Sequence, residues 1–150
     1  SRALGEDDKF INRKLKAAVK GRLEPILCVG SGTKANFTAA AIKRVITRQI
    51  QEALVGVRPE KIELTLAYEP VWAISRGLGT GKAVSPAHAA EIISYIGLSV
   101  PSARVIYGGS VDGANAADFA RQPSIQGALV GGASLNAQEF LKVSEAFSGT

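Results

Sequence analysis

The sequence predicts an α/β fold built on a parallel sheet. Short apolar runs that end at glycine or glutamate alternate with longer segments in which apolar residues recur at helical spacing. This alternation is typical of parallel strands joined by right-handed helical crossovers. The chain has 150 residues, of which 46% are hydrophobic, and this is enough apolar material for the core of one domain.

The elements are expected in the order helix, then four strand–helix units. The first helix spans residues 6–22, with an apolar stripe of Phe10, Leu15, Ala18 and Val19. Strands are expected over 25–30, 62–68, 103–109 and 125–131, and the other helices over 35–54, 85–98, 115–121 and 136–147. Ser85 before Pro86 is a strong helix start, and Asn136 is the expected cap of the last helix.

Composition and charge exclude several classes of partner. The formal net charge is +5, but the basic residues lie at helical spacing or among acidic ones. No aromatic residues are interleaved with them to stack bases, so no nucleic acid is expected. No apolar stretch approaches the ~20 residues of a membrane helix, so no membrane partner is expected. There is no cysteine or histidine cluster for a metal, and the single Cys28 indicates a reducing, cytoplasmic compartment.

Glu69 is the first candidate for chemistry, because it follows an apolar strand and precedes Pro70 and Trp72. Partial burial would raise the pKa of its carboxyl and make the carboxylate a better proton acceptor near neutral pH. A surface glutamate that ends a strand is the other interpretation of the same pattern. His88 and Cys28 are expected to be a surface or capping residue and a core residue, respectively.

Glycine pairs follow the third and fourth expected strands, at 108–109 and 131–132. Glycine lets a phosphate oxygen approach backbone N–H groups closely. Two such loops after successive strands are typical of the phosphate site at the carboxyl end of (β/α)8 barrels, and they favour a phosphate-bearing ligand. Three further glycines between Trp72 and Ser85 suit a mobile lid as well as an ordinary loop.

Taken together, these loops resemble those of the triosephosphate isomerase family. The likeness is carried, in the family's order, by residues 26–30, 67–74, 79–82, 106–111 and 129–135. It covers nearly the whole chain, and the Tyr-Glu-Pro-Val-Trp-Ala segment is its most specific part. The resemblance implies a (β/α)8 barrel, of which this chain would be about the second half, with four parallel strands and flanking helices.

The resemblance also implies a function. The family interconverts dihydroxyacetone phosphate and glyceraldehyde 3-phosphate through an enediol, in glycolysis and gluconeogenesis, without metal or cofactor. Glu69 would be the catalytic base, and Tyr107 would latch the closed lid. The substrate phosphate would be bound by Gly79, Ser110, Gly131 and Gly132. The lid would comprise Pro70, Val71, Trp72, Ala73, Ile74, Thr80, Gly81 and Lys82.

Three departures from the family pattern accompany this likeness. The family's catalytic lysine and histidine, and its dimerisation loop, would precede Ser1. The lid carries extra residues at 75–78, and Ser31 stands where the family usually has an acidic residue. Four strands cut from a barrel leave open edges and an uncovered face. Stable folding is therefore expected to need more chain, an amino-terminal half-barrel or a second copy, and a homo-oligomer, such as the family's homodimer, is expected.

Two alternative functions remain open from the sequence. The longer lid would suit a related isomerase acting on a four-carbon ketose phosphate. The absence of the family's lysine and histidine from this chain would suit a non-catalytic phosphate-binding or assembly half-barrel.

Overall fold

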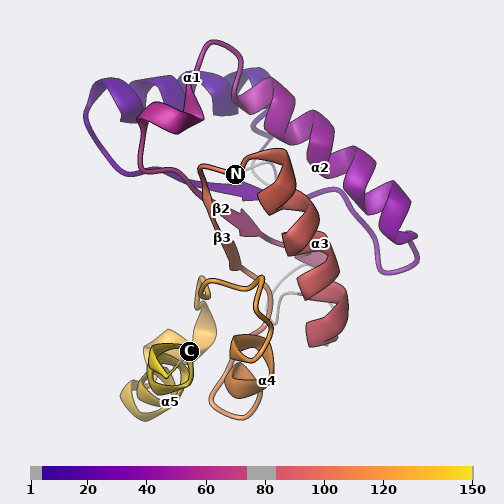
Figure 1. The fold of residues 1–150 in the computed structure, drawn as a ribbon, viewed down its shortest axis with the longest axis vertical. Helices are drawn as coiled ribbons and strands as arrows, with labels where there is room; N and C mark the ends of the chain where they lie inside the picture. The colour runs from indigo at the N-terminus through magenta and orange to yellow at the C-terminus, as the bar shows by residue number, and fades with distance from the viewer. Residues whose placement is uncertain (1–4, 74–83, 150) are drawn as a thin grey trace.

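The computed structural model describes residues 5–73 and 84–149, and within these residues three strands form one parallel sheet in the order β1-β2-β3 (Figure 1). The strands are β1 (Ile26–Val29), β2 (Thr65–Tyr68) and β3 (Arg104–Tyr107), which lie within the first three predicted strands. The α/β class and the parallel arrangement with flanking helices are confirmed.

The helices are α1 (Asp8–Lys20), α2 (Ala39–Ala53), α3 (Pro86–Ser99), α4 (Ala116–Ala120) and α5 (Ala137–Ser148), with 3-10 turns η2 (Pro59–Lys61), η3 (Val71–Ala73) and η4 (Gly132–Leu135). The helix expected over 35–54 begins later than predicted, at Ala39, whereas α3 and α5 begin at the caps that the sequence predicts. The Ser85 hydroxyl accepts a hydrogen bond from the His88 N–H, and the Asn136 side chain accepts from the N–H groups of Gln138 and Glu139. These bonds satisfy N–H groups that have no partner within the helix.

One face of the sheet is fully covered by helices. Two rows of side chains across the sheet, Leu27–Leu66–Val105 and Val29–Tyr68–Tyr107, are all buried in the core. Figure 1 shows α2 and α3 on the same side of the strands. On the other face, Ile26 is 52% exposed and Cys28 is half-buried, so this face lacks a complete cover within the described residues.

The prediction of a fourth strand at residues 125–131 is wrong. This segment runs along β3, where Leu129 N–H donates to the Tyr107 carbonyl at 2.8 Å, but it forms only a single bridge between Tyr107 and Ala128. The Val105 N–H donates to the side-chain oxygen of Gln126 at 2.7 Å instead of to a backbone carbonyl of this segment. The ladder is interrupted there, and a regular strand does not form.

The apolar stripe of the first helix is also narrower than predicted. Leu15 is buried, whereas Phe10 is 41% exposed. The Arg13 guanidinium lies 5.2 Å from the centre of the Phe10 ring, so this aromatic side chain contacts cations at the surface. The expected core position of Phe10 is therefore wrong.

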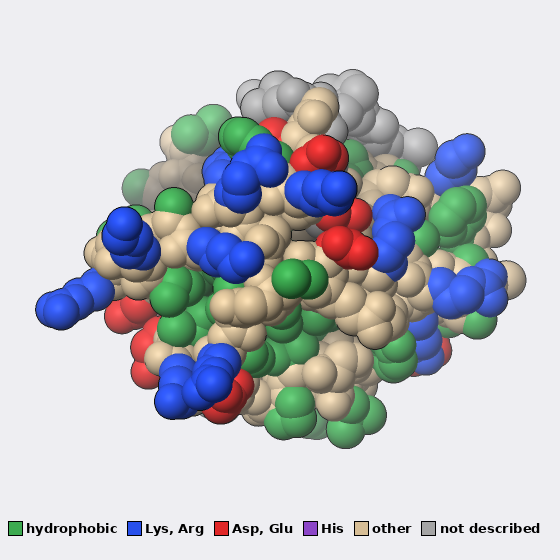
Figure 2. All heavy atoms as spheres, turned by 90° about the horizontal axis from the view of Figure 1, so that it is seen from above, with side chains coloured by type: hydrophobic (Ala, Val, Ile, Leu, Met, Phe, Trp, Pro, Cys, Tyr) green, Lys and Arg blue, Asp and Glu red, His purple; other side chains and the backbone are tan. Residues whose placement is uncertain are grey.

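Basic side chains are prominent on the face that carries α1 and the turn after α2. Figure 2 shows this face from above, with lysine and arginine side chains spread across it and fewer acidic ones. No helix in the described parts of the chain is long and apolar enough to span a membrane.

Candidate functional site

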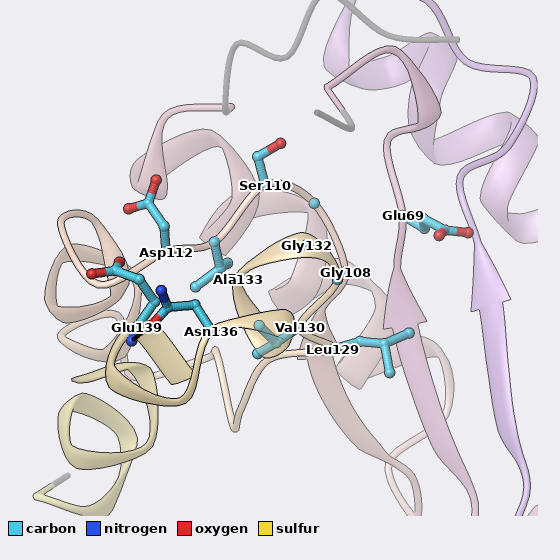
Figure 3. A pocket seen from close by; sticks show the side chains of 13 residues that line it. Glu69, Gly108, Ser110, Asp112, Leu129, Val130, Gly132, Ala133, Asn136 and Glu139 are labelled. Carbon is cyan, nitrogen blue, oxygen red and sulfur yellow. Dashed lines mark hydrogen bonds between the residues drawn. The ribbon is translucent and has the colours of Figure 1, made fainter. Parts of the chain in front are cut away.

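A cavity of about 540 Å³ opens at the carboxyl ends of β2 and β3 (Figure 3). This volume is within the usual range of small-molecule sites. Three segments line it: the end of β2, the loop after β3, and the segment leading into α5. Its lining residues are Glu69, Gly108, Gly109, Ser110, Val111, Asp112, Leu129, Val130, Gly131, Gly132, Ala133, Asn136 and Glu139.

Glu69 directly follows β2, and its backbone fixes it to the neighbouring strand. Its N–H donates to the Val29 carbonyl at 2.7 Å. Burial raises the pKa of the Glu69 carboxyl above its ordinary value, because the charged form loses water contacts. In Figure 3 the side chain extends from the end of β2 toward the end of β1, away from Ser110. The site therefore holds a partly desolvated carboxylate on a rigid strand end.

The first part of the predicted lid, Pro70 to Ala73, forms a tight turn beside the loop after β3. Pro70 and Ala73 are buried, and the Ala73 N–H donates to the Pro70 carbonyl at 2.8 Å. The Ser110 hydroxyl donates to the Ala73 carbonyl at 2.6 Å, which joins the turn to the loop after β3. The remaining predicted lid and phosphate residues, Ile74, Gly79, Thr80, Gly81 and Lys82, lie outside the described residues.

Tyr107, the predicted latch, lies in the core at the end of β3. Its ring stacks on Phe119 of α4 with the centroids 4.4 Å apart, and it is tilted against Tyr68 at 6.4 Å. Burial raises the pKa of the Tyr107 hydroxyl to about 12, while the nearby backbone of Val84 acts in the opposite direction. The latch role stays a prediction.

The two glycine pairs line the same cavity but differ in their surroundings. A Cβ atom on Gly109 would overlap the Tyr107 hydroxyl and ring, so a side chain at this position would force the Tyr107 ring to move. A Cβ atom on Gly131 or Gly132 would meet nothing within 4 Å, and both residues are exposed. The N–H groups of Gly131 and Gly132 donate to no other described residue, which leaves them available to a ligand.

The cavity has an acidic end that the sequence did not predict. Asp112 accepts hydrogen bonds from the N–H groups of Ala114 and Asn115. Glu139 accepts from the Gly113 N–H at 3.0 Å and from the Lys142 ammonium at 2.8 Å, which lowers the pKa of the Glu139 carboxyl. Figure 3 shows both carboxylates at the opposite end of the cavity from Glu69.

A buried glutamine, also missed, organises the loop after β1. Gln49 is 1% exposed, and its oxygen accepts from the Gly30 N–H at 2.8 Å while its amide donates to the Ser31 carbonyl at 2.7 Å. The signal was present in the sequence, because Gln49 lies on the same side of its helix as Ile42, Ile46 and Ile50.

The described residues contain no group of three or more histidine, cysteine or carboxylate side chains that could hold a metal. His88 lies in the first turn of α3 and does not line the cavity. Cys28 is half-buried, rather than the fully buried core residue that the sequence suggested.

Comparison with known proteins agrees with this architecture. The family model for triosephosphate isomerase matches residues 1–147. The chain belongs to the triosephosphate isomerase family. Triosephosphate isomerases from Bordetella pertussis and Moorella thermoacetica are both 43% identical to it, over 94% and 93% of the chain, and the enzyme from Chloroflexus aurantiacus is 41% identical over 93%. The chain spans 57% or 58% of the length of these relatives.

Proposed function

We propose that this chain forms the carboxyl-terminal half of a triosephosphate isomerase and carries its catalytic base, Glu69. The observation that supports this most strongly is that one cavity is lined by Glu69 and by both glycine pairs. The relatives are triosephosphate isomerases, and the chain spans 57% of their length. Both findings support the same assignment.

The proposed reaction moves one proton between adjacent carbons of the substrate. The Glu69 carboxylate takes a proton from C1 of dihydroxyacetone phosphate. The electron pair of that C–H bond forms the C1–C2 double bond, while the π pair of the C2 carbonyl moves onto O2, which takes up a proton to give the enediol. Return of the carbon-bound proton from Glu69 to C2, with loss of the O1 proton and formation of the C1 carbonyl, gives glyceraldehyde 3-phosphate. The raised pKa of Glu69 suits this role, because a stronger base accepts a carbon-bound proton more readily near neutral pH.

The phosphate group is proposed to lie at the other loops of the cavity. The exposed N–H groups of Gly131 and Gly132, with Ser110, would bind its oxygens. Gly79 and the proposed lid, from Pro70 to Lys82, would complete the site and exclude water from the enediol. The sugar phosphate is thus the proposed small-molecule partner, and an amino-terminal half-barrel or a second copy is the proposed protein partner.

The test joins this chain to the amino-terminal half of the Bordetella pertussis relative and measures isomerisation of dihydroxyacetone phosphate. We expect an active protein, and we expect Glu69→Gln to lower kcat by about 10³-fold, because general-base catalysis is typically of this size. The matched control is Glu63→Gln, which removes an exposed carboxylate just before β2 and is expected to leave kcat unchanged.

Two outcomes would contradict the proposal. Equal activity of the Glu69→Gln variant and the parent would remove Glu69 as the base. A folded but inactive joined protein that still binds the triose phosphate would favour a phosphate-binding module without catalysis.

A further inference from the structure

We propose a second ligand site, for an organic molecule with two or more phosphoryl groups, in a basic cavity between α1 and the turn that joins α2 to η2. This cavity has a volume of about 330 Å³. Its residues precede β1 and β2 in the chain, whereas Glu69 follows β2, so it lies at the opposite end of the sheet from the candidate active site. The inference is independent of the proposed function.

Four cations surround this cavity: Lys16, Lys20, Arg58 and Lys61. None of them forms an ion pair with another residue in the described parts of the chain. Other basic residues do have carboxylate partners, as Lys43 has in Glu91 at 2.7 Å. Glu60 lies between two of the four cations in sequence, but it does not line the cavity. The positive charge is therefore uncompensated by the cavity's own walls.

The walls of the cavity are tied together without a ligand. The Asn12 side-chain amide of α1 donates to the carbonyls of Ala53 and Val55, at 2.7 and 2.9 Å. These bonds hold α1 against the end of α2. In the turn that follows, Gly56 has φ +70°, and a Cβ atom there would lie 3.3 Å from the Lys16 ammonium. The Lys16 side chain thus reaches across from α1 to the Gly56 backbone, which places its charge at the cavity.

The residues that line the cavity favour one class of anion over others. Four cations within one cavity favour a ligand with several negative charges over a single phosphate, since charge-assisted hydrogen bonds add up. Val19, Val57 and Ile62 supply an apolar floor packed against the core, which suits an organic portion. No aromatic side chain lines the cavity, so it offers no surface for stacking the bases of a nucleic-acid strand.

The test is isothermal titration of the protein that joins this chain to the amino-terminal half of the Bordetella pertussis relative, with ATP, tripolyphosphate and inorganic phosphate at fixed ionic strength. We expect one equivalent of ATP to bind more tightly than tripolyphosphate, and inorganic phosphate to bind most weakly. The Lys16→Ala/Lys61→Ala variant is expected to bind ATP about tenfold more weakly. Lys16→Arg/Lys61→Arg keeps the charge and is expected to retain binding. Thermal unfolding of each variant confirms that it is folded.

The matched control is Lys9→Ala/Lys34→Ala, which makes the same change in net charge at exposed positions outside the cavity. An equal loss of affinity in this control would overturn the proposal, because diffuse attraction to a basic protein would explain it. Absence of ATP binding would also overturn it. Equal affinity for ATP and tripolyphosphate would overturn the proposal that the ligand has an organic portion bound on the apolar floor.

A second control separates this cavity from the candidate active site. Gly132→Val alters the candidate active site and must leave ATP affinity unchanged. A loss of ATP affinity in this variant would place the ligand in the candidate active site instead.

Discussion

The two glycine pairs of this chain, at 108–109 and 131–132, have the same sequence, but glycine is present in them for different physical reasons. At Gly109 the Tyr107 side chain occupies the space where a Cβ would lie, so packing requires glycine. At Gly131 and Gly132 the space is open and the backbone is exposed, so packing does not require glycine. A glycine after a strand can therefore serve the core or a ligand, and only its surroundings distinguish these roles.

The largest expected effect is the loss of stability in Gly109→Ala. The new methyl group would force the Tyr107 side chain from its place between Phe119 and Tyr68, and overpacking of a core typically costs about 1–3 kcal/mol. Urea unfolding of the protein that joins this chain to the relative's amino-terminal half measures the change. Combining Gly109→Ala with Tyr107→Leu should recover part of the lost free energy of unfolding. If Gly109→Ala alone is as stable as the parent, packing against Tyr107 does not require glycine at this position.

A third glycine turn, at Gly30, differs from both pairs because it depends on a polar side chain. Gln49→Leu would leave the buried Gly30 N–H without its acceptor, and an unsatisfied buried donor costs about 1–3 kcal/mol. The same unfolding measurement applies. The matched control is Gln51→Leu, which changes an exposed glutamine of the same helix and is expected to have little effect. Equal losses of stability in the two variants would mean that the bond to Gly30 is not the cause.

Gly132→Val tests the ligand role of the second pair. We expect the free energy of unfolding to change by less than about 0.5 kcal/mol, since the position is exposed and open. The isopropyl group would occupy space in front of the exposed N–H groups and weaken phosphate binding by about tenfold. Phosphate-induced shifts of the Gly131 and Gly132 amide signals, measured by NMR, report the binding. Unchanged affinity in the variant would remove these loops from the phosphate site.

The smallest expected effect is on the pH dependence of stability, through Glu69 in the cavity that both glycine pairs line. Because the pKa of Glu69 is raised in the folded state, this residue favours folding most below its unfolded pKa, and that contribution is lost as pH rises through the folded pKa. Glu69→Gln should therefore reduce the decline in stability over that pH window. Thermal unfolding across mildly acidic to neutral pH tests this, with Glu63→Gln as the exposed control. Identical pH profiles for the parent and Glu69→Gln would show that the carboxyl is fully hydrated.

Most of the fold was predictable because its signals are local. Ser85 with Pro86 and Asn136 begin helices through hydrogen bonds within a few residues of sequence. The prediction of a fourth strand failed because the Gln126 side chain takes the Val105 N–H, a contact between residues 21 apart in the chain. The structure brings Glu69, Ser110, Gly131 and Gly132 around one cavity, while the packing reason for Gly109 depends on the direction of the Tyr107 ring, which no periodicity shows.

The single tryptophan of the chain, Trp72, lies half-buried in η3, three residues after Glu69. Its indole is therefore a natural optical probe at the edge of the candidate site, with no overlapping emission from another indole of the chain. A shift in its fluorescence on adding a sugar phosphate would record an event beside the carboxylate without any label being attached.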